Sequence, residues 1–122
     1  HFKKVNDTYG HQAGDMVLKT VSEILKNSVY ETDFAARYGG EEFVVIFPKT
    51  DPEGLKIKSE KIRQKIEQTE ITVGLEKIKV TASFGIAHYP KDSQVAEEVL
   101  RCADMSLYKS KQTGRNKVTE FE

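Results

Sequence analysis

The sequence lacks the disulfide bonds and the membrane-anchoring segments that can hold a small domain together or tether it. Its single cysteine, Cys102, excludes an internal disulfide and lies in a helical apolar pattern, which favours a small buried side chain. A lone cysteine also favours a reducing compartment. No apolar run approaches the ~20 residues of a membrane span, and no signal peptide is visible. We therefore expect a cytoplasmic domain, although the longer protein around it could be tethered to a membrane.

Net charge is also lacking, since Lys+Arg 19 and Asp+Glu 19 balance to zero. A general nucleic-acid binder is usually basic, so we expect no nucleic-acid partner. Hydrophobic residues make up 38% of the 122 residues, which suits one modest core and a single domain over residues 1–122. The chain begins at His1 rather than Met, inside a motif, and we interpret it as an N-terminally truncated piece of a longer protein.

Periodicity and turn chemistry predict the elements. Residues 1–15 are polar and rich in turn formers, which predicts a loop, with Asp15 at the start of the helix that follows. Strands are expected at 34–38 and 43–47, joined by a four-residue "GGEE" loop, and again at 71–73, 77–89 and 116–121. A second helix runs from an Asp51 cap to about Gln68, and Asp92 and Ser93 are expected to cap a third.

The helix after Asp51 carries many cations, and its default interpretation is a solvated face: Lys56, Lys58, Lys61, Arg63 and Lys65. The third helix is expected to direct an apolar stripe inward and to end at Gly114: Val95, Val99, Leu100, Ala103 and Leu107. The element order predicts an α/β sandwich with helices on a mostly antiparallel sheet, a ferredoxin-like βαββαβ core whose first strand would precede His1.

Four features could carry chemistry. Glu41 and Glu42 stand side by side at the hairpin tip, where paired carboxylates suit a hard cation such as Mg²⁺; an acidic, solvent-exposed tip is the alternative. Asn6 and Asp15 could together read a purine edge, or could serve as turn former and helix cap.

The other two features are basic. Lys111 and Arg115, four residues apart at a helix end, could clamp phosphates or could complement the helix C-terminus. His11 could bind a ligand or be an ordinary loop residue, and the residues alone leave both open.

Four stretches of the sequence, three of which contain these features, follow one another in this order: "HFKKVNDTYGHQAGD", "ARYGGEEF", "TASFGIAHYP" and "ADMSLYKSKQTGRNKV". In that order they resemble the GGDEF family of diguanylate cyclases, in its GGEEF variant, over essentially the whole chain. The resemblance implies a fold like nucleotidyl cyclases and polymerase palms. It implies condensation of two GTP molecules into cyclic di-GMP, with two Mg²⁺ (or Mn²⁺) ions, across a homodimer. The resemblance also implies an upstream sensory or receiver domain in the longer protein.

The resemblance also assigns roles by position. Glu41 matches the metal-binding acid and Glu42 its neighbour near the attacking hydroxyl, while Gly39 and Gly40 let the backbone approach the nucleotide. Asn6 and Asp15 match the guanine readers, and His11 a base-side or sugar-side contact. The remaining matches concern phosphate: Phe2 and Lys3 in the cradle of the β- and γ-phosphates, Lys111 and Arg115 in the clamp.

Two departures from the family pattern matter. The family's aspartate two positions before His1 lies outside this sequence, so we expect the fragment alone to bind Mg²⁺-GTP poorly and turn over little. An Arg-x-x-Asp product-inhibition site is replaced by "YETD", in which Tyr30 stands for the arginine and Asp33 is kept. A tyrosine cannot form a bidentate cationic clamp, so we expect that form of inhibition to be absent.

Two rival functions remain. One is a degenerate family member that binds GTP or dimerises to regulate a partner; the intact "GGEEF" disfavours it. The other is a ferredoxin-like RNA-binding module, which would display aromatic residues on a basic sheet face. The neutral charge and the acidic hairpin tip disfavour that second alternative.

Overall fold

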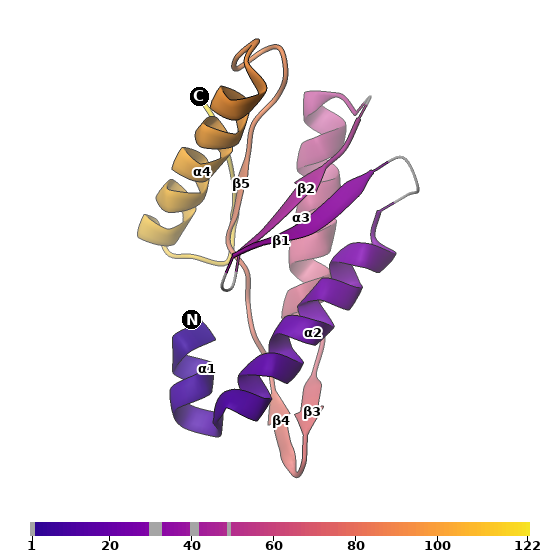
Figure 1. The fold of residues 1–122 in the computed structure, drawn as a ribbon, viewed down its shortest axis with the longest axis vertical. Helices are drawn as coiled ribbons and strands as arrows, with labels where there is room; N and C mark the ends of the chain where they lie inside the picture. Colours follow the sequence, from indigo (N-terminus) through magenta and orange to yellow (C-terminus); the bar gives the residue numbers. More distant parts are fainter. Residues whose placement is uncertain (1, 30–32, 40–41, 49) are drawn as a thin grey trace. The chain divides into compact units, whose positions relative to one another are not determined.

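The computed structural model describes residues 2–29, 33–39, 42–48 and 50–122, and for residues 2–4 and 39 it describes the backbone alone (Figure 1). The chain forms two compact units, which are described separately. The first unit comprises His1–Lys49 with Lys65–Val80, and the second comprises Thr50–Gln64 with Thr81–Glu122.

Among the described residues, the first unit holds two complete helices, the last turn of a third helix and two hairpins. Its complete helices are α1 (Phe2–Tyr9) and α2 (His11–Asn27), separated by Gly10, whose φ is 92°. Its strands pair as antiparallel hairpins: β1 (Phe34–Gly39) with β2 (Glu42–Ile46), and β3 (Ile71–Val73) with β4 (Glu76–Ile78).

The loop predicted for residues 1–15 is wrong, because residues 2–9 form α1 and residues 11–15 begin α2. Burial outweighs the turn-forming composition: Val5 on α1 enters a hydrophobic core with Ala13 and Val17 of α2. Ile71 and Ile78 of the second hairpin complete that core. Asp15 therefore lies inside α2 rather than at its start.

The strands of the first hairpin are confirmed, but its loop is shorter than predicted. Gly39 is paired with Glu42, so two residues rather than four separate the strands. The register shifts between Arg37 and Gly39, next to the turn. Gly40 and Glu41 lie outside the described residues.

The second unit contains most of α3 (Pro52–Gln68), the strands β5 (Phe84–Ile86) and β6 (Val118–Glu120), and α4 (Ala96–Gln112). The predicted cap of α3 is confirmed: the Gly54 N–H donates to Asp51 Oδ1 at 2.6 Å. Among the described strands, pairing gives three two-stranded ladders rather than one sheet, and the β5–β6 ladder is parallel. The mixed α+β class is confirmed.

Helix α4 lies directly on the β5–β6 ladder. A Cβ added to Gly85 of β5 would meet the Ala103 carbonyl oxygen at 2.1 Å and the Leu107 nitrogen at 2.2 Å. The fully buried Ser110 hydroxyl is 2.7 Å from the Phe84 carbonyl oxygen and 2.5 Å from the Thr119 hydroxyl. Small residues thus bring this helix unusually close to the strands.

The start of α4 differs from the prediction. The helix begins at Ala96, and its N-cap residue, Val95, makes no side-chain cap bond. The Asp92 carboxylate instead accepts from the His88 backbone N–H at 2.7 Å, and Ser93 Oγ accepts from the Val95 N–H at 3.1 Å. The expected apolar stripe is also partly wrong, because Val95 and Leu100 are exposed.

No helix in the described ranges is long and apolar enough to cross a bilayer.

Candidate functional site

The residues proposed from the sequence fall on both units, and each unit is considered by itself. Asn6, His11, Asp15 and Glu42 are described with their side chains in the first unit. Phe2 and Lys3 are placed by their backbone in the first turn of α1, and Gly39 ends β1. Gly40 and Glu41, although central to the prediction, lie outside the described residues.

Asn6 presents a buried acceptor without a partner. It lies on α1, and its Oδ1 has no hydrogen-bond partner among the described residues. A buried acceptor left unpaired is unfavourable by about 1–3 kcal/mol. Such an atom is the kind of group that a donor on a ligand would satisfy.

Asp15 borders a hollow on the same unit. The hollow has a volume of about 230 Å³ and lies between α2 and the β1–β2 hairpin. Its lining residues are Asp15, Leu18, Lys19, Ser22, Arg37 and Phe43. An aromatic ring, aliphatic carbon and charges of both signs suit a flat ring with polar edges.

The start of α1 bears on the phosphate role proposed for Phe2 and Lys3. They belong to a helix rather than to the loop predicted from the sequence. The first N–H groups of a helix have no acceptor within it and attract anions. His11 is exposed as the first residue of α2, which leaves its ring accessible.

The hairpin places one described carboxylate beside the turn. Glu42 begins β2, is half-buried, and pairs with Gly39 across the ladder. In the part of the chain that the structure describes, no three His, Cys, Asp or Glu side chains gather closely enough to hold a metal ion. The donor type of Glu42, a carboxylate oxygen, nevertheless suits Mg²⁺.

Lys111 and Arg115 lie at the end of α4 in the second unit. Lys111 belongs to the last turn, and Thr113 is the C-cap. Gly114 (φ 115°), Arg115 (φ 62°) and Asn116 (φ 49°) follow in left-handed conformations. Gly114 thus follows the helix end as predicted, but two non-glycine residues continue in a region that side chains disfavour.

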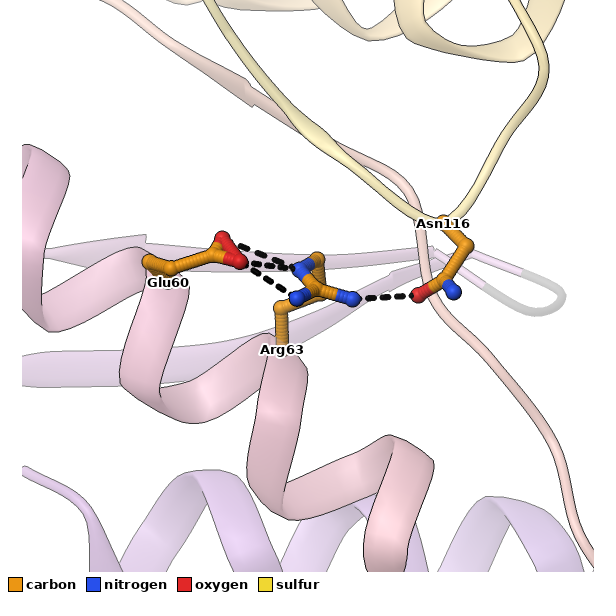
Figure 2. A network of polar contacts seen from close by, with 3 residues as sticks. All are labelled: Glu60, Arg63 and Asn116. Carbon is orange, nitrogen blue, oxygen red and sulfur yellow. Dashed lines mark hydrogen bonds and ion pairs between the residues drawn. The ribbon is translucent and has the colours of Figure 1, made fainter.

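Among the described residues, hydrogen bonds to several segments of the second unit hold this unusual loop. The Arg115 N–H donates to the Ser110 carbonyl oxygen at 2.9 Å, and the Asn116 N–H donates to Ser83 Oγ at 3.2 Å. Another bond comes from α3: Arg63 Nη1 donates to Asn116 Oδ1 at 2.8 Å (Figure 2). The loop is therefore tied to α4, to the residue before β5, and to α3.

The sequence predicts a solvated face for Arg63, and that prediction is wrong. Its side chain is only 13% exposed, and its Nε lies 2.6 and 2.9 Å from the two carboxylate oxygens of Glu60, with an ion pair from Nη2 (Figure 2). The hydrogen bond from Arg63 and its positive charge hold the pKa of Glu60 below its ordinary value of 4.5, against a smaller opposing effect of burial. The i, i+3 spacing of the pair was the available signal.

Comparisons with known proteins bear on the family of the chain. The family model described as "Diguanylate cyclase, GGDEF domain" matches residues 1–117. Diguanylate cyclase A of Treponema denticola is 46% identical over 118 residues, 97% of this chain and 32% of that protein. The chain thus spans about a third of the length of this curated relative.

Solved structures match over almost the whole chain. The GGDEF domain of YfiN (TpbB) from Pseudomonas aeruginosa has a TM-score of 0.92 at 30% identity, covering 100% of this chain and 76% of that one. The coiled coil and GGDEF domain of DgcB from Caulobacter crescentus, solved with c-di-GMP, has a TM-score of 0.88 at 35% identity, covering 98% and 64%.

Proposed function

The chain belongs to the GGDEF family of diguanylate cyclase domains, and we propose that it condenses two GTP molecules into cyclic di-GMP. The 3′-hydroxyl of each GTP attacks the α-phosphate of the other. Each attack forms one phosphodiester bond and breaks the bond to the β-phosphate, so two pyrophosphates leave. The protein's part in such a displacement is mostly positioning and charge stabilisation.

The unpaired Asn6 oxygen is the observation that carries this proposal. Its buried Oδ1 needs a donor, and the Watson–Crick edge of guanine offers N–H groups. Adenine offers fewer donors on that edge, so the acceptor favours guanine. We place Asp15 beside Asn6 as a second acceptor for guanine, since it borders the hollow next to the hairpin.

Two groups of residues, one at the start of α1 and one at the end of α4, would bind the phosphates. Phe2 and Lys3 would offer the N–H groups of the first turn of α1, together with the Lys3 ammonium. Lys111 and Arg115 would contact the phosphates as cations, since an arginine fork matches phosphate oxygens. His11, exposed at the start of α2, would contact the base or sugar side.

Glu41, and less directly Glu42, would hold the Mg²⁺ or Mn²⁺ that this chemistry uses. A bound divalent ion would neutralise charge on the triphosphate and favour the ionised hydroxyl. In this proposal Glu42 lies near the attacking 3′-hydroxyl. Two copies of the domain, each with one GTP, would meet as a homodimer. The longer protein would also carry a sensory or receiver domain elsewhere in its chain.

The test is an incubation of the longer protein with GTP and Mg²⁺, followed by chromatographic detection of cyclic di-GMP. Glu41→Lys is the matched control, because it reverses the charge that we assign to metal binding. We expect product from the wild type and none from the variant. GTP binding without any product would instead support a regulatory, catalytically degenerate module.

A further inference from the structure

The guanidinium of Arg63 joins two parts of the second unit that are distant in sequence. Glu60 and Arg63 lie one turn apart on α3, whereas Asn116 lies 53 positions beyond Arg63, after α4. Nε and Nη2 face the Glu60 carboxylate, which leaves Nη1 directed at Asn116 Oδ1 (Figure 2). A planar guanidinium held on one edge has little freedom to turn, so its opposite edge is a fixed donor.

The residue that receives this bond stands in a conformation that needs support. Asn116 has a φ of 49° and Arg115 a φ of 62°, and consecutive left-handed non-glycine residues persist only where their surroundings over-determine them. Such strained backbone is found most often where function requires one exact geometry. Asn116 is the next residue after Arg115, so fixing Asn116 fixes the point from which the Arg115 side chain departs.

We propose that Glu60, Arg63 and Asn116 are positioning residues that hold the backbone of Arg115 so that its guanidinium meets the phosphates of the bound nucleotide. The inference rests on the proposed function, because that function assigns Arg115 to phosphate. It adds residues on α3 to the machinery of the phosphate clamp. It also gives a role to the ion pair between Glu60 and the largely buried Arg63.

The role predicts a particular selectivity among ligands. Loss of the Arg63–Asn116 bond should lower the affinity for ligands that carry β- and γ-phosphates. The affinity for ligands that lack these phosphates should stay nearly unchanged. A purely structural role would weaken both alike, since a distorted domain loses guanine recognition as well. The two roles are therefore separable by comparing two probes.

The test is calorimetry on the longer protein with two probes in Mg²⁺ buffer. One probe is α,β-methylene-GTP, in which carbon replaces the oxygen that would leave, and the other is GMP. Asn116→Gly removes the acceptor but keeps the left-handed backbone accessible. Asn116→Asp keeps an acceptor, and Arg63→Met removes the donor; thermal unfolding of each variant confirms folding.

We expect Asn116→Gly and Arg63→Met to lower the affinity for α,β-methylene-GTP by about tenfold, the size of one lost charge-assisted bond. The affinity for GMP should fall by less than about twofold. Asn116→Asp should retain most of the affinity. In an Arg115→Ala background, Arg63→Met should cause little further loss, because its effect passes through Arg115.

Two results would overturn the positioning role while leaving the clamp intact. One is an equal loss of affinity for both probes, and the other is an undiminished effect of Arg63→Met in the Arg115→Ala background. A different result identifies failure of the proposed function. If Arg115→Ala alone leaves the α,β-methylene-GTP affinity unchanged, the phosphate clamp is wrong, and this inference falls with it.

Discussion

Gly85→Ala should be the most damaging single-methyl addition in the second unit. The new Cβ would stand 2.1 Å from the Ala103 carbonyl oxygen and 2.7 Å from Leu107 Cα. A Cβ essentially never comes within 3.0 Å of a heavy atom outside its own residue and chain neighbours, so α4 would have to recede by about 1 Å. The obstructing atoms are helix backbone, which cannot rotate away as a side chain would.

The shift of α4 would also strain the bond that joins it to β5. Ser110 Oγ now lies 2.7 Å from the Phe84 carbonyl oxygen, and the Ser110 side chain is fully buried. Overpacking a core usually destabilises by about 1–3 kcal/mol, and we expect about 3 kcal/mol here. For a chain of this size, that corresponds to a melting temperature lower by about 10 °C.

The assay is thermal unfolding followed by circular dichroism, with Gly74→Ala as the matched control. Gly74 lies in the β3–β4 turn with a φ of 61° and has nothing within 4 Å of an added Cβ. Alanine there meets only the backbone penalty, about 1 kcal/mol. A melting temperature for Gly85→Ala equal to that of Gly74→Ala would refute the close packing of α4 on β5.

Three further predictions follow from individual residues. Asn6→Ala should weaken GTP binding at least tenfold without lowering the melting temperature of the unliganded protein, because Oδ1 has no partner to lose; a large loss of stability would contradict this. Glu60→Gln should lower the stability of the protein at neutral pH. Because the pKa of Glu60 is lowered in the folded protein, the stability that its carboxylate contributes is present above pH 4.5 and is lost as pH falls through the folded pKa. The melting temperatures of wild type and variant, measured across pH, should therefore converge in acid. Cyclic di-GMP should bind weakly near Asp33, and Tyr30→Arg should strengthen it at least tenfold by calorimetry; tight binding by the wild type would refute the loss of product inhibition.

Local signals predicted the elements where one residue type decides the outcome. Asp51 before Pro52 places the start of α3, and its side-chain bond to Gly54 is the expected cap. The glycines of the "GGEE" turn and the continuous apolar run that follows it likewise predict the β1–β2 hairpin. The motif resemblance then led to the correct family, which composition alone could not indicate.

The predictions failed where tertiary contacts outweigh local propensity. Residues 2–9 read as a loop from composition, yet burial of Val5 in the core stabilises a helix. Asp92 reads as a helix cap, yet its carboxylate is engaged by the His88 backbone. Arg63 reads as surface charge, because a single sequence cannot show that residue 116 lies beside it.

The candidate site was predictable in its residue types but not in its supports. Asn6, Asp15, Lys111 and Arg115 were named from motifs, and the structure adds a buried oxygen, a hollow and an anchored loop. None of these three features has a signature in the sequence. They depend on long-range packing, which periodicity and propensity do not record.

The central claim is that two GTP molecules are joined, and product stoichiometry tests it most directly. Pyrophosphate and cyclic di-GMP should be quantified together after the longer protein is incubated with GTP and Mg²⁺. We predict two pyrophosphates for each cyclic di-GMP, with a rate per protein that rises as dilute copies are concentrated into dimers. Release of orthophosphate and GDP, or GTP that is bound and recovered unchanged, would contradict the account.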